Sequence, residues 1–304
     1  MLQLSAMGRG DPADLNEAVS HALAAVVERS GAPLRAWSLA VSFLGDCIVP
    51  RGGDVGMATI TEVLAAFGIE PGVIRTSMSR LASDGWVMRQ KVGRNSFYSL
   101  TPIALAESEA ATRRIYAARH PQDPCSWRVY LGGGLSKPEQ ARLREALRRR
   151  GAADLGAHVY LLPAVDDLPG PGHAIALNAD PLPNADARLL VERAFDLATL
   201  AEDYTQFVAA FAPVREGVGG GRKLSGIDAL AMRIFVIHCF RRIVLRDPMI
   251  PAPYLPESWP GIAARETAAA IWRAFFRASE AWLDANAASA YGPLPPRSNP
   301  WQRF

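Results

Sequence analysis

The stretch "IRTSMSRLASDGWVMRQKVGRNSFYSL", Ile74 to Leu100, decides the fold because its periodicity changes halfway along. In the first half, Ile74, Met78 and Leu81 recur at i, i+4 and i+7, which is the spacing of one helix face. Asp84-Gly85 then ends the periodic run. The first half therefore predicts an amphipathic helix with a single apolar face.

The second half predicts a β-hairpin. Trp86 to Lys91 and Ser96 to Leu100 are two short strand-like runs, and Gly93-Arg94-Asn95 supplies the turn between them. Short polar and basic residues make up the candidate contacts, which are Arg75, Thr76, Ser79 and Arg80 on the helix and Arg89, Lys91, Arg94, Asn95 and Tyr98 on the hairpin. Arginine can fork onto guanine, and the hairpin residues suit phosphates, so the pattern favours a nucleic-acid backbone and its base edges.

The region before this stretch extends the same domain. Residues 1–33 are expected to form a loose arm with one short helix around Glu17 to Arg29. A helical run from Leu34 and the helix "MATITEVLAAFGI" follow. Three helices with a tight glycine-containing turn before the third, then a hairpin, have the order of a winged helix-turn-helix. With the connecting helix "LTPIALAESEAATRRIYAARH", this domain is expected over residues 34–122.

Two further domains are expected after the boundary that Pro121 and Pro124 mark. The segments "SWRVYLGG", "KPEQARLREALRRRG", "GAHVYLLP" and "GHAIALNAD" predict strand, helix, strand and strand, which indicates a small ferredoxin-like unit over residues 123–182. Helical periodicity then dominates residues 183–286, and residues 287–304 form a polar, proline-rich tail. The predicted fold class is α+β, with an N-terminal winged helix, a central ferredoxin-like domain and a C-terminal all-helical domain.

The charge of the chain is unevenly placed. The formal net charge of the 304 residues is only +3. Ile74 to Leu100 holds five basic residues against one acidic residue, a local +4, and Lys137 to Arg150 holds six against two, another +4. The remainder is therefore −5, which is 3 − 4 − 4. Basic residues are concentrated where they would steer an anion.

The sequence lacks the motifs of metal-binding, disulfide-rich, membrane-spanning and nucleotide-binding proteins. Cys47, Cys125 and Cys239 lie far apart without CxxC spacing, which argues against a disulfide framework and a zinc site. No run of ~18 apolar residues occurs, so a cytoplasmic protein without a membrane partner is expected. The histidines show no HExxH spacing, and "GVGGGRKLS" lacks the Gly-Lys-Ser order of a phosphate loop. We therefore expect no catalytic residue, no metal site, no cofactor and no enzyme activity.

Two stretches carry a resemblance to a known family. "IRTSMSRLASDGWVMRQKVGRNSFYSLTP" resembles the DNA-binding segment of the PaaX family, transcriptional repressors of phenylacetate catabolism. Independently, "IHCFRRIVLRDPMIPAPYLPESWPGIAARE", Ile237 to Glu266, is similar to that family's C-terminal block. The resemblance implies a double-stranded DNA operator as the partner. It also implies a homodimer whose two winged helices contact an inverted repeat.

The resemblance further implies that the central domain is like a subunit of the CRISPR adaptation nuclease. Such a nuclease needs a carboxylate at the end of its first strand to hold a cation. Here Leu131-Gly132-Gly133-Gly134 fills that position. Catalysis is therefore not expected, and the domain is expected to serve dimerisation or spacing. The basic helix within Lys137 to Arg150 is either a solvated face or a contact to flanking DNA.

The resemblance also implies a small-molecule effector, an aryl acyl-CoA thioester such as phenylacetyl-CoA, whose binding releases the operator. Such a ligand needs cationic donors for its phosphates and an apolar slot for its aryl group. The candidate effector residues are His238, Arg241, Arg242, Arg246 and Trp259. A structural alternative stays open, in which the arginines pair with Glu202, Asp203 or Asp247 and hold helices together.

Two competing functions also stay open. The first is a CoA-thioester-binding enzyme that keeps a vestigial winged helix, and it would need a nucleophile or general base in the ligand pocket. The second is an RNA-binding or protein-docking module that uses the basic helix within Lys137 to Arg150. The second would lose function when the charges of that helix are removed, but not when Arg75 and Arg80 become alanine.

Overall fold

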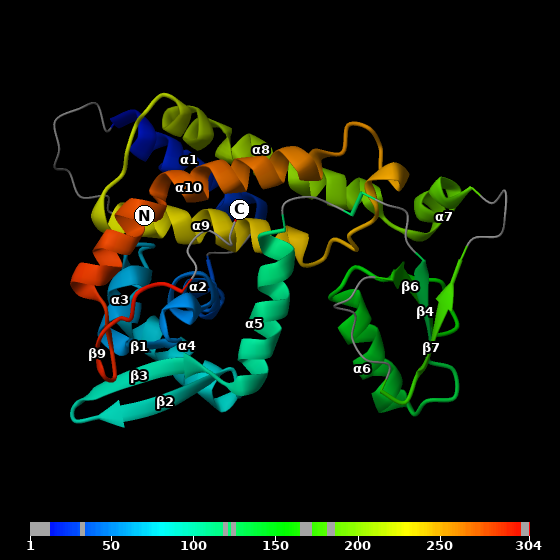
Figure 1. The fold of residues 1–304 in the computed structure, drawn as a ribbon, viewed down its shortest axis with the longest axis horizontal. Helices are drawn as coiled ribbons and strands as arrows, with labels where there is room; N and C mark the ends of the chain where they lie inside the picture. Colours follow the sequence, from blue (N-terminus) through cyan, green and yellow to red (C-terminus); the bar gives the residue numbers. More distant parts are fainter. Residues whose placement is uncertain are drawn as a thin grey trace. The chain divides into compact units, whose positions relative to one another are not determined.

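The computed structural model describes residues 13–30, 34–117, 121–122, 126–164, 172–180, 186–298 and 304. The described residues fall into two compact units of helices and small sheets, so the expected α+β class is confirmed (Figure 1). The first unit takes its residues from Met1–Tyr116, Phe207–Phe240 and Ala264–Phe304. The second takes them from Ala117–Gln206 and Arg241–Ala263.

The N-terminal part of the first unit contains α1 (Ala13–Ser30), α2 (Ala36–Phe43), the π-helix η1 (Leu44–Ile48), the short 3-10 helix η2 (Val49–Arg51), β1 (Asp54–Gly56), α3 (Met57–Ala65), α4 (Pro71–Ser83), β2 (Val87–Val92), β3 (Asn95–Leu100) and α5 (Pro102–Ile115). The short helix expected around Glu17 to Arg29 thus lies within α1. Residues 1–12 and 31–33 of the expected arm lie outside the described residues.

The opening stretch folds as its periodicity predicts. Ile74, Met78 and Leu81 are all buried on one face of α4. Strands β2 and β3 pair antiparallel, and Gly93 takes a φ of +58° at the first turn position, where a type II′ turn needs positive φ. Strand β1 pairs with the other edge of β3, giving the order β1-β3-β2, and its three residues are too few for a sequence pattern.

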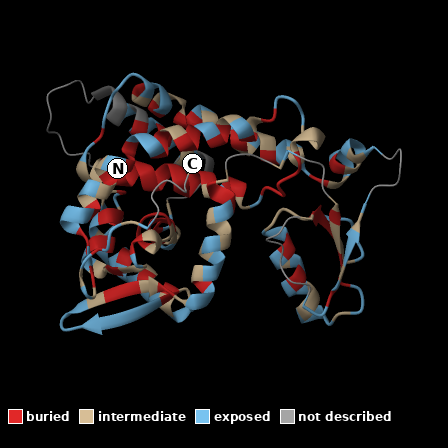
Figure 2. Ribbon diagram, viewed as in Figure 1, coloured by how far each residue is buried: buried red, intermediate tan, exposed pale blue. Residues whose placement is uncertain are grey.

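Helix α9 (Gly226–Val244) forms the centre of the first unit. Every residue from 231 to 240 is buried, which Figure 2 shows as a continuous red helix. Phe235 lies 6.5 Å from Phe67, which follows α3, and 5.4 Å from Phe211 of α8 (Leu197–Gly219), measured between ring centroids. A helix segment that is buried all round needs neighbours on every side. The N-terminal helices supply part of that cover.

This packing corrects the expected division into domains. The all-helical domain expected over residues 183–286 is not one unit, because α8, α9 and α10 (Pro260–Asn286) each give residues to both units. The central part of α9 shares a core with residues near the N-terminus. The expected domain therefore has no separate core of its own.

A buried polar network joins η1, η2, α9 and α10 of the first unit to Tyr116, which follows α5. The π-helix η1 turns Asp46 inward, where its carboxylate accepts from Arg233 Nε at 2.7 Å and Tyr116 Oη at 2.5 Å. The carboxylate of Glu280 on α10 accepts from Arg233 at 2.6 Å and from Arg51 at 3.1 Å. Burial disfavours the charge of Arg233, but Asp46 and Glu280 outweigh burial and raise its pKa above the usual value.

The second unit is built on a four-stranded sheet. Its elements are β4 (Trp127–Leu131), α6 (Lys137–Arg148), β5 (Ala153–Asp154), β6 (Val159–Pro163), β7 (Ile175–Ala179), α7 (Ala187–Ala194) and the 3-10 helix η3 (Ala252–Tyr254). The strands are antiparallel in the order β5-β6-β4-β7. Leu143 and Leu147 of α6 pack on one face of the sheet, and Val191 of α7 packs on the other. The expected strands and helix are present, and the two-residue β5 is additional.

Residues 287–298 of the expected tail fold against the first unit. They include the small hairpin of β8 (Ala288–Ser289) and β9 (Gly292–Pro293), and the side chain of Arg297 is only 5% exposed. Residues 299–303 lie outside the described residues. Within the described part of the chain, every helix is too short or too polar to span a bilayer.

Candidate nucleic-acid interface

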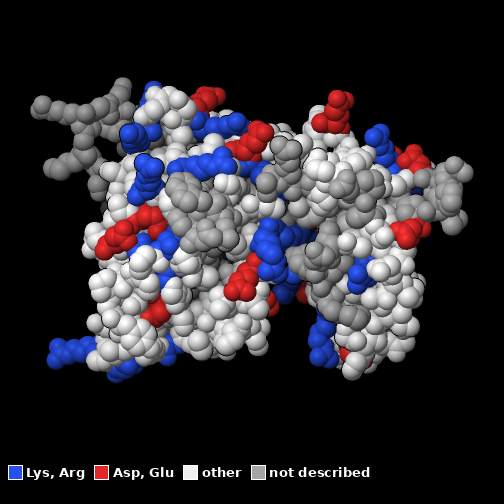
Figure 3. Space-filling view, viewed as in Figure 1, with Lys and Arg blue, Asp and Glu red and all other residues white. Residues whose placement is uncertain are grey.

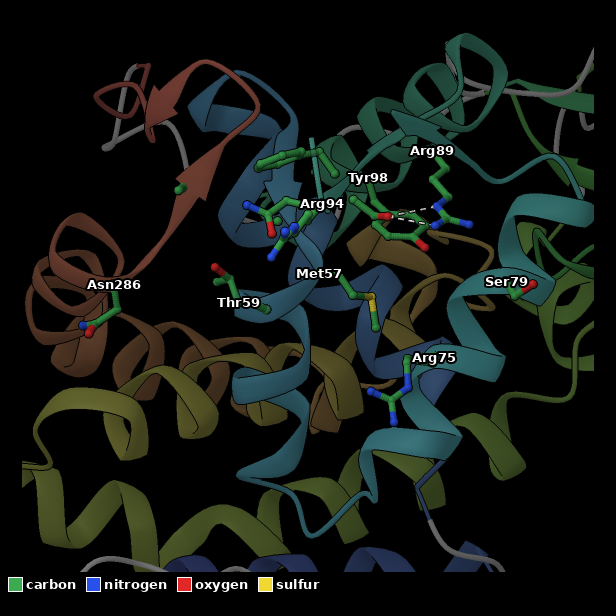
Figure 4. A pocket seen from close by; sticks show the side chains of 14 residues that line it. Met57, Thr59, Arg75, Ser79, Arg89, Arg94, Tyr98 and Asn286 are labelled. Carbon is green, nitrogen blue, oxygen red and sulfur yellow. Dashed lines mark hydrogen bonds between the residues drawn. The ribbon is translucent and has the colours of Figure 1, made fainter. Parts of the chain in front are cut away.

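A cleft of about 470 Å³ lies between α4, the β2–β3 hairpin, the start of α3 and the end of α10 (Figure 4). Its lining residues are Gly56, Met57, Ala58, Thr59, Arg75, Ser79, Arg89, Arg94, Asn95, Ser96, Phe97, Tyr98, Asn286 and Ala288. Three of these residues are arginines and none is acidic. The cleft therefore favours a negatively charged ligand.

The arginines reach the cleft from two elements. Arg75 projects from the exposed face of α4, whereas Arg89 and Arg94 belong to the hairpin (Figure 4). The guanidinium of Arg89 is held in place by Ser96 Oγ, which accepts from its Nε at 3.1 Å and from one terminal nitrogen at 2.9 Å. The first turn of α3 also faces the cleft, and its N-cap residue Gly56 has no side chain to accept from it. That helix terminus adds a positive partial charge.

The remaining predicted contacts on α4 and the hairpin lie outside the lining of the cleft. Thr76 is exposed on α4, and its hydroxyl donates to Gly72 O at 3.0 Å. Arg80 is 81% exposed and lies 4.0 Å from the Asp84 carboxylate. Lys91 is exposed on β2, and Lys and Arg side chains project at the tip of the hairpin in the lower left of Figure 3. These residues extend the basic surface beyond the cleft.

Tyr98 differs from the other hairpin candidates. It lines the cleft, but it is only 6% exposed, and on β3 it is paired with Val55 of β1. The sequence predicts Tyr98 as a DNA contact on the strand Ser96 to Leu100, and the structure keeps it on that strand but buries most of its side chain. Strand β1, which the sequence does not predict, pairs with β3 at this position.

Sequence reasoning missed two groups of cleft residues. Met57 to Thr59 line it from the start of α3, and Asn286 with Ala288 lines it from the end of α10 and from β8. No local pattern marks Asn286 as a binding residue. Asn286 reaches the cleft because the segment around residues 286–288 packs beside residues 54–59.

The predicted effector residues are placed in different surroundings. His238 is buried, with its Nδ1 3.1 Å from Ser42 Oγ. Trp259 is 4% exposed and packs edge-on against Tyr204, with 6.0 Å between ring centroids. Burial of these two side chains argues against their contacting a ligand in this conformation.

The arginines of the predicted effector set also differ from one another. Arg246 donates to the Asp203 carboxylate at 2.7 Å, which is the structural alternative considered for this residue. Arg241 is half-buried, whereas Arg242 is exposed. Arg242 and Arg246 are thus both exposed, and Arg242 lies outside the pair with Asp203.

The described residues contain no cluster of three or more His, Cys, Asp or Glu side chains that could hold a metal ion. Cys47 and Cys239 are buried cysteines, and Cys125 lies outside the described residues. Burial raises the pKa of the Cys47 thiol well above its usual range. A thiol in that state is a poor nucleophile.

The fold and the cleft define an α+β protein with an exposed basic surface suited to a polyanion. The family description "PaaX-like protein" matches residues 35–103, and "PaaX-like protein C-terminal domain" matches residues 195–285. The first match contains α4 and the hairpin, and the second contains α8, α9 and nearly all of α10. The chain belongs to the PaaX-like family.

The chain is also similar to one repressor and to one protein of solved structure. The chain is 28% identical to the transcriptional repressor PaaX of Escherichia coli (strain K12) over 95% of its own length and 94% of that protein. That relative is a transcriptional repressor. A solved structure of an uncharacterised protein from Mycobacterium tuberculosis matches with a TM-score of 0.47 and 21% identity, covering 74% of this chain and 90% of that one.

Proposed function

We propose that this protein is a DNA-binding transcriptional repressor in which α2, α3, α4 and the β1-β3-β2 sheet act as a winged helix-turn-helix. The observation that carries the proposal is the cleft that Arg75 of α4 and Arg94 of the hairpin turn both line, without any acidic lining residue. Kinship with a transcriptional repressor along nearly the whole chain supports the same function.

In this proposal the exposed face of α4 enters the major groove. Arg75 and Arg80 are exposed and long enough to fork onto guanine, and Thr76 and Ser79 are short enough to let the helix approach the bases. The hairpin follows the sugar-phosphate backbone through Lys91, Arg94 and Asn95, with Arg89 held beside it by Ser96. Base choice is therefore assigned to α4, whereas the hairpin adds affinity.

The sheet of the second unit supports a further part of the proposal. The antiparallel order β5-β6-β4-β7, with α6 between β4 and β5, is compatible with a ferredoxin-like unit. We assign this unit to spacing or dimerisation. Two copies related by a two-fold axis would then place two α4 helices on the half-sites of an inverted repeat.

The helix α6 is not favoured as the nucleic-acid surface. Glu145 accepts from Arg148 Nε at 3.0 Å and from Arg149 Nε at 2.8 Å, so one carboxylate offsets two of its cations. The hydrogen bonds from Arg148 and then Arg149 lower the pKa of Glu145 to about 2, so the carboxylate is charged at neutral pH. The basic run is therefore better explained as a solvated, internally paired face.

We further propose that an aryl acyl-CoA thioester such as phenylacetyl-CoA releases the repressor from the operator of an aromatic-acid catabolic operon. A ligand can shift a conformational equilibrium only by its different affinities for the two states. The thioester must therefore bind more tightly to a conformation in which the α4 helices no longer match both half-sites. Of the predicted effector residues, the exposed Arg242 is the best candidate for a phosphate contact.

Fluorescence polarisation tests both parts of this proposal. The purified protein is titrated onto labelled DNA from upstream of its own gene cluster, at fixed salt, with and without phenylacetyl-CoA. We expect tight binding that is lost with the thioester and kept with free CoA or free phenylacetate. Tight binding that does not change when the thioester is added would refute the proposed effector but not the proposed repressor. If the upstream DNA binds no more strongly than a random duplex, the proposed repressor function is refuted as well.

A further inference from the structure

The far end of the chain forms one side of the basic cleft. We call residues 286–298 the C-terminal strap. Asn286 and Ala288 of this strap line the cleft together with Arg75 and Arg94 (Figure 4). Strand β8 lies along β1, where Ala288 O is 3.6 Å from the position that a Cβ on Gly56 would take. The strap is thus the neighbour of the sheet that carries the hairpin.

Hydrogen bonds hold the strap against β1 and the residues before it. The backbone N–H of Ala290 donates to the Asp54 carboxylate at 2.6 Å. Pro295 O accepts from Arg51 Nε at 3.0 Å, and the backbone N–H of Ser298 donates to Pro50 O at 2.8 Å. The contacts run along the strap from its hairpin to its last residue, so its path follows the edge of the sheet.

The strap is also fixed to the buried network of the first unit. The side chain of Arg297 is 5% exposed, and one of its terminal nitrogens donates to Asp46 O at 3.1 Å and to Glu280 at 3.2 Å. A buried charged pair is costly to break, because one partner would be left uncompensated. The strap is therefore a built part of the unit, and its contribution to the cleft is held in place.

Asn286 is the strap residue with polar side-chain groups at the cleft. It is exposed at the end of α10, and its Nδ2 donates to Trp282 O at 2.8 Å. That bond satisfies a carbonyl of the last helical turn and leaves the amide a second N–H. The same cleft is lined by three arginines, and a neutral amide on its lining can donate to an anion without adding repulsion.

We infer that the C-terminal strap is part of the DNA-binding surface and that Asn286 contacts the sugar-phosphate backbone of DNA seated in the cleft. This inference rests on the proposed DNA binding. It assigns a binding role to a segment that lies next to α4 and the hairpin only through folding. A phosphate contact strengthens binding to every sequence alike, so the strap adds affinity and not base choice.

Substitutions of opposite charge at Asn286 test this inference. Asn286→Asp puts a carboxylate beside the phosphates, and we expect it to weaken binding to the upstream duplex and to a random duplex of equal length by about tenfold each, since ~1.4 kcal/mol of repulsion is a factor of ten. Asn286→Lys should strengthen both and steepen the salt dependence of log K by about one ion. If Asn286 only caps α10, the aspartate and lysine variants should not change DNA affinity in opposite directions.

Ala281→Asp is the matched control, because Ala281 is exposed on the same helix outside the lining of the cleft. It adds the same charge and should change DNA affinity less than twofold. Equal losses for the two aspartate variants, or an unchanged salt slope for Asn286→Lys, would overturn the inference. Wild-type binding that is lost on Arg75→Ala would meanwhile uphold the DNA-binding function itself. Absence of wild-type binding would instead refute that function.

Discussion

Arg75 and Arg233 carry the same guanidinium group in opposite surroundings. Arg233 is fully buried, and its charge is balanced by Asp46 and Glu280 at 2.7 and 2.6 Å. Arg75 is exposed and lines a cleft without acidic residues. A buried charge is kept only when it is paired, whereas an exposed charge can bind an external anion. Pairing and burial thus separate the structural arginines from the candidate binding arginines.

At the residue scale, Arg80→Ala and Lys91→Ala should weaken DNA binding in different ways. Arg80→Ala should cost ~1–3 kcal/mol on the operator and relax the preference at one base pair, because a fork onto guanine is lost. Lys91→Ala should weaken operator and random DNA alike and flatten the salt slope by about one, because a phosphate contact is lost. Polarisation titrations on both duplexes at several salt concentrations measure these effects. If Arg80→Ala weakens both duplexes equally, Arg80 does not contact base edges.

At the element scale, one carboxylate links η1, α9 and α10. Asp46 accepts from Arg233 on α9 and from Trp272 Nε1 on α10, the latter at 3.2 Å. Arg233 also lies over the ring of Trp272, with its Cζ 5.1 Å from the ring centroid. A π-helical segment often marks a site where a side chain needs a particular direction. Here the π-helix brings Asp46 into the core at the point where the helices meet.

Asp46→Asn should therefore destabilise the first unit strongly. It leaves Arg233 with a buried positive charge and one strong partner fewer, for which ~3–5 kcal/mol is typical. Asp284→Asn is the matched control, because the Asp284 side chain is 65% exposed although it also pairs with an arginine, Arg51. The control should cost ~0–1 kcal/mol, since water screens an exposed pair. Urea unfolding followed by tryptophan fluorescence compares the two, and similar midpoints would contradict a structural role for Asp46.

At the scale of the whole molecule, operator binding and effector response are expected to use different residues. The cleft belongs to the first unit, whereas Arg242 and Trp259 belong to the second. The pairing of Arg246 with Asp203 and the burial of Trp259 leave Arg242 as the candidate for ligand contact. The two responses should therefore be separable by mutation.

Arg242→Ala should leave DNA affinity unchanged and prevent release by phenylacetyl-CoA, because a phosphate contact to the effector is lost. The measurement is operator binding by fluorescence polarisation across a titration of the thioester. Arg222→Ala, another exposed arginine of the chain, serves as the control and should release normally. If the Arg242→Ala variant is released from the operator at the same thioester concentration as the wild type, the effector binds elsewhere.

Much of the local fold could be predicted from the sequence. Helix α4, the β2–β3 hairpin and the β4–α6 pair follow from periodicity and turn residues, because these signals depend on neighbours a few positions apart. Arg75 and Arg94 could be predicted as exposed candidate contacts for the same reason. Arg75 lies opposite the apolar face of its helix, and Arg94 lies in the turn of the hairpin. Strands β1 and β5 could not be predicted, because three and two residues carry no period.

The sequence by itself determined which faces are apolar and which carry charge, because the 3.6- and 2-residue periods of helix and strand set those faces locally. The tertiary structure alone decided which distant groups meet. It buried Tyr98, paired Arg246 with Asp203, divided the C-terminal helices between two units and brought Asn286 to the cleft. Each outcome depends on close packing between segments far apart in the chain, and no periodicity within one segment records its partner.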